Sequence, residues 1–201
     1  MTEPRILIFD LEITANEGFF WPGRMWETNI IKITNPWYIL TFSAKWLNGK
    51  CVTRGLPDYP EFKKDKHSDK SLVKELWGLI DKADLIIGHN NDRFDHKKLN
   101  TRFLVHRLPP PRPYKTLDTL KIARKHFAFD SNKLNDIGQY TDEGQKLDHN
   151  GFSLWEKAMW GDKRAFNKMC RYNRQDVLLD EKVFKRFKPW VKYPKIKTLK
   201  D

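Results

Sequence analysis

Five short apolar segments constrain the fold of this chain most strongly, because segments of this length and composition form strands more readily than helices. They are rich in β-branched and aromatic residues and lie at Arg5–Phe9, Trp37–Ser43, Cys51–Thr53, Ala83–Gly88 and Tyr114–Thr116. The turn pair Asn48–Gly49 separates the second segment from the third, which predicts a tight hairpin between them. We therefore expect a sheet of about five strands.

Apolar residues at helical spacing dominate much of the remaining chain. Ser71–Lys82 repeats leucine and isoleucine at this spacing, and a second helix is expected over Phe94–His106, ahead of the prolines at 109–111. A long helix is expected over Phe166–Phe187. Strands that mostly precede the helices, around a mixed sheet, are typical of the α/β and α+β classes. We expect an α/β fold in which helices flank the sheet.

The chain carries a strong positive charge. It has 38 lysines and arginines against 26 aspartates and glutamates in 201 residues, a net charge of +12. This excess favours a polyanionic partner such as nucleic acid, since protein cations release counterions from phosphates. A basic surface without a partner accounts for it equally well. The two cysteines, Cys51 and Cys170, have no neighbours at zinc-ligand spacing, so neither a disulfide framework nor a structural zinc site is expected.

The apolar pattern gives no sign of export or of a membrane span. The first residues contain no charged-then-apolar leader, and no apolar run approaches the ~20 residues that span a bilayer. We expect a cytoplasmic protein with no membrane partner. Length and composition suit one domain, 1–190, followed by a basic tail, 191–201. The lysines of this tail either contact the phosphates of a nucleic acid or are simply solvated.

An aromatic insertion at about 15–36 delays the second strand. It contains Phe19, Phe20, Trp21, Arg24 and Trp26. The interpretation we favour is a loop that folds its aromatic side chains onto the body of the protein. The alternative is a stacking surface or lid for single-stranded bases, because an aromatic face stacks on any base.

Acidic residues follow two of the expected strands. Asp10 and Glu12 are two residues apart, so in a strand both carboxylates point to the same face, where they repel each other unless a cation or proton lies between them. Taken alone, a solvated pair at a strand end explains them as well. Asp95 falls in the first turn of an expected helix, where the helix dipole ordinarily explains an acidic residue, and Asn90–Asp92 are candidate caps.

A further acidic residue interrupts an apolar face of the long helix. That face consists of Ala165, Met169, Tyr172, Asp176, Leu179, Val183 and Phe187. A carboxylate on such a face is costly unless it is paired or bound to metal. A salt bridge to Arg171 or Arg174 would satisfy it as well as a metal. Tyr172 precedes Asp176 by one turn, so its hydroxyl is expected in the same region.

Together these segments resemble the three exonuclease motifs of the DnaQ-like DEDD superfamily, a branch of the ribonuclease H-like folds. Phe9–Thr14 resembles the first motif, and Gly88–Asp95 resembles the second through its Asn-x-x-x-Phe-Asp core. Tyr172–Asp176 matches the third, Tyr-x-x-x-Asp, whose tyrosine is that of the DEDDy subgroup. Asp118 resembles a supporting position and not a ligand. The motifs occur in family order, and they imply a ribonuclease H-like α/β fold with a mixed sheet of about five strands flanked by helices.

The resemblance also implies a catalytic group and a metal site. The expected catalytic residues are Asp10, Glu12, Asp95, Tyr172 and Asp176. The four acidic ones are expected to hold two divalent ions, Mg²⁺ or Mn²⁺, since carboxylates without imidazole or thiolate suit these ions better than zinc. By the family likeness, Asp10 is expected to bind both ions. Glu12 and Asp176 are expected to bind the ion that activates the attacking water, and Asp95 is expected to support the other ion. Tyr172 would orient the water and the scissile phosphate. The terminal nucleotide is expected against Leu11, Ile13, Thr14, Asn90 and Phe94.

The activity so implied is that of a 3′-5′ exonuclease that hydrolyses phosphodiester bonds with two metal ions and releases nucleoside 5′-monophosphates. Single-stranded DNA is the expected substrate, because the DEDDy subgroup includes the proofreading domains of family A and B polymerases. The alternatives are a 3′-5′ exoribonuclease and a non-catalytic nucleic-acid-binding module on the same fold. The partner is thus nucleic acid, as single-stranded DNA or 3′ ends, with RNA as the alternative. A replication or repair protein is a possible further partner.

Overall fold

A five-stranded sheet forms the centre of the molecule in the computed structural model, which describes residues 4–23, 28–148 and 151–192. In the strand order β5-β4-β1-β6-β7, β1 is central. It pairs antiparallel with β4 and parallel with β6, so the sheet is mixed, as expected. The five strands are β1 (Ile6–Ile13), β4 (Ile39–Trp46), β5 (Cys51–Gly55), β6 (Leu85–Gly88) and β7 (Lys115–Asp118).

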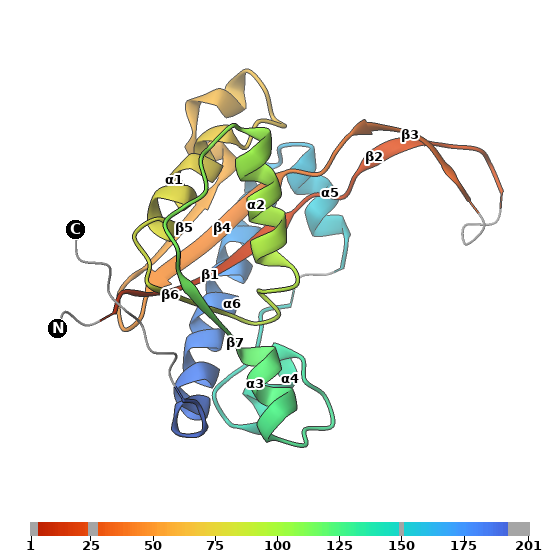
Figure 1. Ribbon diagram of the computed structural model, residues 1–201. Coiled ribbons are helices and arrows are strands. Elements are labelled where there is room, and N and C mark those ends of the chain that lie inside the picture. Colours follow the sequence, from red (N-terminus) through yellow and green to blue (C-terminus); the bar gives the residue numbers. More distant parts are fainter. Residues whose placement is uncertain (1–3, 24–27, 149–150, 193–201) are drawn as a thin grey trace.

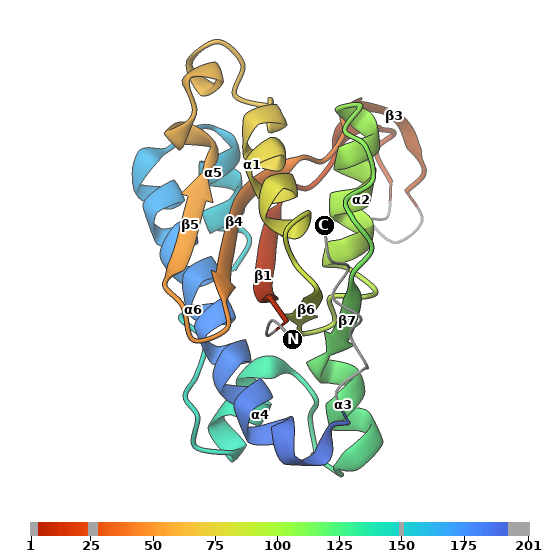
Figure 2. The same ribbon diagram turned by 60° about the vertical axis from the view of Figure 1, so that its left-hand side comes forward.

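Helices cover both faces of this sheet. In Figures 1 and 2, α1 and α2 lie over one face, and α5 and α6 lie over the opposite face. The α-helices are α1 (Lys70–Ile80), α2 (Asp95–Val105), α3 (Thr119–His126), α4 (Leu134–Tyr140), α5 (Ser153–Met159) and α6 (Lys163–Phe187). The expected α/β fold with helices flanking a mixed sheet is therefore confirmed. Within the described residues, no helix combines the length and the apolar character that a membrane crossing requires.

The alternation of side chains along β1 positions two of the acidic residues. The odd-numbered residues of β1 belong to the apolar core that includes residues of α1 and α2. Ile6 and Ile8 instead pack with Val177 of α6 on the other face. Because successive side chains of a strand point to opposite faces, Asp10 and Glu12 continue the row of Ile6 and Ile8 toward α6. A slip of one residue would bury the wrong row, so the apolar residues fix this orientation.

The insertion at 15–36 forms a separate two-stranded ribbon, with β2 at Glu17–Phe20 and β3 at Ile30–Asn35. It projects away from the main sheet in Figure 1. Its backbone pairs with itself, with Phe19 opposite Lys32, so its hydrogen bonds do not depend on the body of the protein.

The aromatic side chains of this ribbon do not fold back onto the protein. Phe19 and Phe20 are each 64% exposed and Trp21 is 75% exposed. The interpretation of the insertion as a loop packed on the body is therefore wrong for these three residues, because the two strands pair with each other and extend outward. Arg24 and Trp26 lie outside the described residues. The stacking surface stays a prediction.

Candidate active site

Three of the four predicted acidic residues meet on the face of the sheet that α6 covers. One carboxylate oxygen from each of Asp10, Glu12 and Asp176 lies within 4.8 Å of the others. We call these three residues the acidic cluster. Glu12 and Asp176 are buried and Asp10 is half-buried. The first two come from alternate positions of β1 and the third from the apolar face of α6, so two periodicities bring the three groups together.

The fourth acidic residue, Asp95, lies beside the cluster and is buried in the first turn of α2. Its Oδ1 accepts a hydrogen bond from the backbone N–H of Leu11 at 3.2 Å, which fastens it to the strand between the two carboxylates of β1. Its charge contributes to raising the pKa of Asp10, although its oxygens are not among the three mutually closest ones. Asp95 is thus placed to support the cluster from the α2 side.

The loop between β6 and α2 is tied to β1. Asn91 donates a hydrogen bond from Nδ2 to the carbonyl of Phe9 at 3.3 Å. Gly88 leaves room for that side chain, since a Cβ at this position would lie 2.2 Å from Asn91 Nδ2. The prediction that side chains of Asn90–Asp92 cap α2 is wrong. The helix follows Phe94 without a side-chain cap, because Asn91 is directed to the carbonyl of Phe9 and Asp92 accepts a hydrogen bond from Lys121.

Lys146 brings a positive charge into the site. Its Nζ donates to Asp176 Oδ2 at 2.5 Å and lies 3.5 Å from the hydroxyl of Tyr172. The sequence suggested Arg171 or Arg174 as salt-bridge partners of Asp176, but Arg174 instead donates to a backbone carbonyl of β5. Lys146 lies in an irregular segment between α4 and α5, where no periodicity marked it as a site residue.

Two further residues that sequence reasoning missed contact the acidic cluster. Asn173 donates from Nδ2 to Asp10 Oδ2 at 2.6 Å. Trp155 of α5 packs edge-on against Tyr172, with ring centroids 6.1 Å apart, and hydrogen-bonds to Glu12. Asn173 follows the predicted tyrosine directly and lies one turn before the acidic residue of α6, so its helical position was an available signal.

Burial and mutual repulsion hold protons on the acidic groups. Burial, followed by the charges of Asp95, Glu12 and Asp176, raises the pKa of Asp10 well above its ordinary value. Burial and the charge of Asp176 raise the pKa of Glu12 to about 8. Burial also raises the pKa of Asp95 to about 7, against the opposing hydrogen bond from the backbone N–H of residue 11. Groups of this kind favour a cation among them, because it would replace the protons.

The tyrosine beside the cluster stays protonated at neutral pH. Burial and the neighbouring Asp176 raise the pKa of Tyr172 to about 12. Its hydroxyl therefore acts as a hydrogen-bond donor and not as a base. Lys146 keeps its charge: burial opposes it, but the Asp176 carboxylate raises the pKa of its ammonium group above the ordinary value.

The donor set fits a hard divalent cation. The three close ligand atoms are all carboxylate oxygens, the ligands that Mg²⁺ and Mn²⁺ prefer. A buried set of anions without such a cation must retain protons, as the raised pKa values of Asp10 and Glu12 indicate. The acidic cluster is thus a candidate metal centre.

The residues expected to hold a terminal nucleotide are placed around β1 and the loop before α2. Leu11 and Thr14 are buried, and Ile13 is partly buried. Phe94 is 40% exposed, and Asn90 adopts a left-handed backbone conformation with φ of 61°. Asn90 lines a cavity that the other four do not line.

A mixed five-stranded sheet whose central strand carries paired carboxylates toward a long helix is the mark of a ribonuclease H-like protein. The sequence matches the model of the RNase_H superfamily over residues 39–188, most of the chain, and the protein belongs to this superfamily. Nucleases of this fold use divalent metal ions, and membership of the superfamily supports a function of the nuclease type. No curated protein matches the sequence.

The fold is similar to that of a much larger protein, the family B DNA polymerase of the hyperthermophilic archaeon Pyrobaculum calidifontis. The match has a TM-score of 0.70 and 16% sequence identity, and it covers 94% of this chain but 25% of the polymerase chain. The protein thus spans about a quarter of the length of that polymerase. The predicted ribonuclease H-like exonuclease fold is confirmed.

Proposed function

We propose that this protein is a DEDDy-type 3′-5′ exonuclease that hydrolyses phosphodiester bonds of single-stranded DNA and releases nucleoside 5′-monophosphates. The observation that carries the proposal is the convergence of acidic side chains from β1, α2 and α6 on one buried point. A module that only binds nucleic acid has no use for such a group, because clustered anions repel phosphates unless cations neutralise them.

The acidic residues divide into two sets around the proposed metal ions. Asp10, Glu12 and Asp176 would hold one Mg²⁺ or Mn²⁺ ion, and Asp95 with Asp10 would hold the second. When bound, two such ions lower the pKa of the attacking water and neutralise the charge that builds on the phosphate and the leaving oxygen.

The other side chains of the site orient these groups. Tyr172 retains its proton at neutral pH and so donates a hydrogen bond that positions the attacking water and the scissile phosphate. Lys146 fixes the carboxylate of Asp176 in one orientation, and Asn173 does the same for Asp10. A fixed carboxylate loses less freedom when it binds an ion, which favours a preorganised site.

Single-stranded DNA is proposed as the substrate on two grounds. The structurally similar protein is a DNA polymerase, and the tyrosine of the third motif is typical of the subgroup that includes proofreading domains. The net charge of +12 favours a polyanion of either kind. In this assignment residues 1–190 are the exonuclease domain, with the ribbon as an insertion, and 191–201 are a basic tail.

Digestion of 5′-labelled oligonucleotides tests the proposal. Matched single-stranded DNA and RNA are incubated with Mg²⁺, with Mn²⁺ and with a chelator, and the products are separated by length. We expect a ladder on DNA that shortens one nucleotide at a time from the 3′ end and vanishes with chelator. A ladder on RNA alone would instead identify an exoribonuclease. Binding without cleavage under every condition would identify a non-catalytic module.

A further inference from the structure

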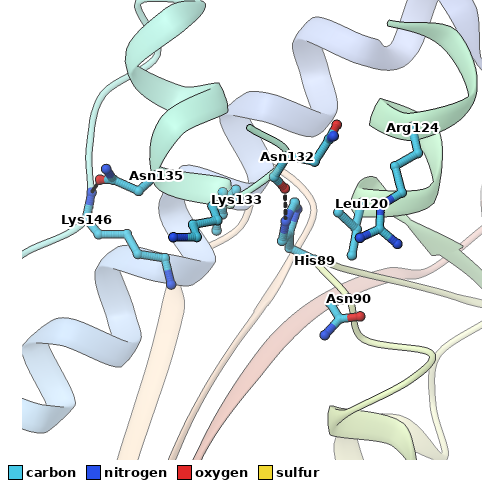
Figure 3. Close-up of a pocket in the computed structure, with 9 residues that line it drawn as sticks. His89, Asn90, Leu120, Arg124, Asn132, Lys133, Asn135 and Lys146 are labelled. Atoms are coloured by element: carbon cyan, nitrogen blue, oxygen red, sulfur yellow. Dashed lines mark hydrogen bonds between the residues drawn. The ribbon is translucent and has the colours of Figure 1, made fainter. Parts of the chain in front are cut away.

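A basic pocket opens beside the acidic cluster. It has a volume of about 530 Å³ and lies between the end of β6, α3 and the segment around α4. The side chains that matter here are those of His89, Asn90, Arg124, Lys133, Asn135 and Lys146, which Figure 3 shows around the opening. None of the described residues that line it is acidic, so it favours an anionic occupant.

Lys146 connects this pocket to the acidic cluster. Its ammonium group contacts Asp176, while its backbone N–H donates to Asn135 Oδ1 at 2.9 Å on the pocket side. An anion in the pocket therefore lies next to the point where the metal ions are proposed. Arg124 and Lys133 are exposed, and among the described residues neither forms an ion pair, so both are available to a ligand.

The wall of the pocket is held in place by a neutral histidine. One ring nitrogen of His89 donates to the carbonyl of Asn132 at 3.0 Å, the bond drawn in Figure 3, and the other lies 3.0 Å from the hydroxyl of Thr119. Burial lowers the pKa of His89 to about 4, so it links the loop after β6 to α3 and to the loop that precedes α4 without adding charge. The charge of the pocket thus comes from Arg124, Lys133 and Lys146, around a fixed frame.

The acidic cluster has two sides, and only one carries this pocket. In both views of the molecule, α5 lies near one end of α6 and the α3–α4 unit near the other, with β1 between them (Figures 1 and 2). Four of the five residues expected against the terminal nucleotide, Thr14 and Phe94 among them, do not line the pocket, whereas Asn90 lies at its edge between the two sides. The retained strand is joined to the scissile phosphate through the 3′ oxygen of the penultimate nucleotide. It therefore needs a path on the other side of the acidic cluster.

We propose that the basic pocket binds the backbone phosphates of the retained strand, on the 5′ side of the bond that is cut. This inference rests on the proposed exonuclease function and names how the same site holds its substrate. Arg124 and Lys133 supply contacts that do not depend on base sequence. Single-stranded substrates of several nucleotides then bind more tightly than an ester of a single nucleotide, because the ester has no retained strand to occupy the pocket.

Two substrates separate the pocket from the catalytic centre. One is a single-stranded oligothymidylate. The other is the p-nitrophenyl ester of thymidine 5′-monophosphate, in which p-nitrophenolate takes the place of the retained strand. Water adds to phosphorus in both cases. The ester releases p-nitrophenolate with the bonding electrons. The oligonucleotide releases the shortened strand, whose 3′ oxygen keeps the bonding electrons and gains a proton.

The test variant is Arg124→Ala combined with Lys133→Ala, and the matched control is Lys125→Ala, an exposed cation of the same helix α3 that does not line the pocket. We expect the double variant to raise KM for the oligonucleotide about tenfold and to reduce the slope of log affinity against log salt by about 1.4, at about 0.7 per lost contact. Its kcat/KM on the ester should stay within about twofold of the wild type. The control should match the wild type on both substrates.

Equilibrium binding of a fluorescent oligonucleotide, measured with chelator present, keeps this inference separate from the nuclease proposal. Weaker binding and a smaller salt slope in the double variant support the pocket even if the wild type cleaves neither substrate, an outcome that defeats the exonuclease function alone. Unchanged affinity and slope overturn the pocket assignment, whatever the catalytic result. Equal loss on ester and oligonucleotide also overturns it, because the residues would then act on the catalytic centre.

Discussion

The acidic cluster is expected to make the metal-free protein less stable as the pH rises. Burial and the charge of Asp176 raise the pKa of Glu12 to about 8 in the folded protein, whereas the ordinary value is 4.5. A carboxyl group whose pKa rises on folding holds its proton more tightly in the folded state. Its contribution to stability is therefore complete below pH 4.5 and is lost as the pH rises through 8.

The size of this effect follows from the width of the pH window. One such group costs about 1.4 kcal/mol per pH unit within the window, so Glu12 lowers the free energy of unfolding by about 3 kcal/mol between pH 5 and pH 7. Asp95, whose pKa burial raises to about 7, acts in the same direction. A domain has a total stability of about 5–15 kcal/mol, so a loss of this size is measurable.

Urea unfolding followed by tryptophan fluorescence at pH 5, 6 and 7 measures the loss, first with chelator and then with Mg²⁺. With chelator present, Glu12→Gln should reduce the fall in the free energy of unfolding between pH 5 and pH 7 by about 3 kcal/mol. Asp130→Asn, at an exposed position, should leave that fall unchanged. Mg²⁺ should flatten the pH dependence, because binding to the folded state alone stabilises it. An unfolding free energy that stays constant from pH 5 to pH 7 in chelator would refute the reasoning, as would a full decline in the glutamine variant.

The remaining predictions concern single side chains and segments. Asp10→Ala should abolish metal-dependent digestion while circular dichroism shows an intact fold; wild-type turnover would remove Asp10 from the site. Tyr172→Phe should lower kcat about tenfold, the value of one hydrogen bond, and an unchanged kcat would exclude its hydroxyl. Replacing Phe19 and Phe20 by alanine should weaken single-strand binding by about 1–3 kcal/mol per stacked base at unchanged Tm, and equal affinity would exclude stacking on the ribbon. Truncation after Trp190 should lower the salt dependence of binding, whereas an unaltered slope would indicate a solvated tail.

The sheet and the acidic cluster could be predicted because both depend on strict periodicities. Alternation along β1 directs Asp10 and Glu12 to one face, and helical spacing along α6 places Tyr172 and Asp176 on a face that is buried throughout. The fourth acidic residue needed the family likeness, since a helix dipole explains an acidic first turn equally well. Its bond to the backbone of β1 joins segments 84 residues apart, a distance that no local pattern spans.

Other features escaped prediction for physical reasons. Lys146 lies in a segment without regular structure, so its pairing with Asp176 depends on tertiary packing alone. The insertion was expected to be a loop, whereas it forms a ribbon whose pairing register shifts at two positions. Helix α6 begins at Lys163, three residues before the predicted start, because Asp162 accepts a hydrogen bond from the backbone of residue 165. That capping residue was visible in the sequence as a helix-start signal.

Under the proposed function, the packing around the acidic cluster suits cleavage at the end of a nucleic-acid strand better than cleavage within it. An enzyme that cuts internally needs space for the strand on both sides of the scissile bond. On the side of α3 and α4, the basic pocket offers about 530 Å³. On the side of α5, Trp155 hydrogen-bonds to Glu12 and packs against Tyr172. Thr14, which directly follows β1, is buried. In the proposed binding mode, a continuing nucleic-acid strand would have to displace these packed side chains, whereas a terminal nucleotide would not. For the proposed exonuclease, this asymmetry of packing around one set of carboxylates would be a physical basis for its polarity.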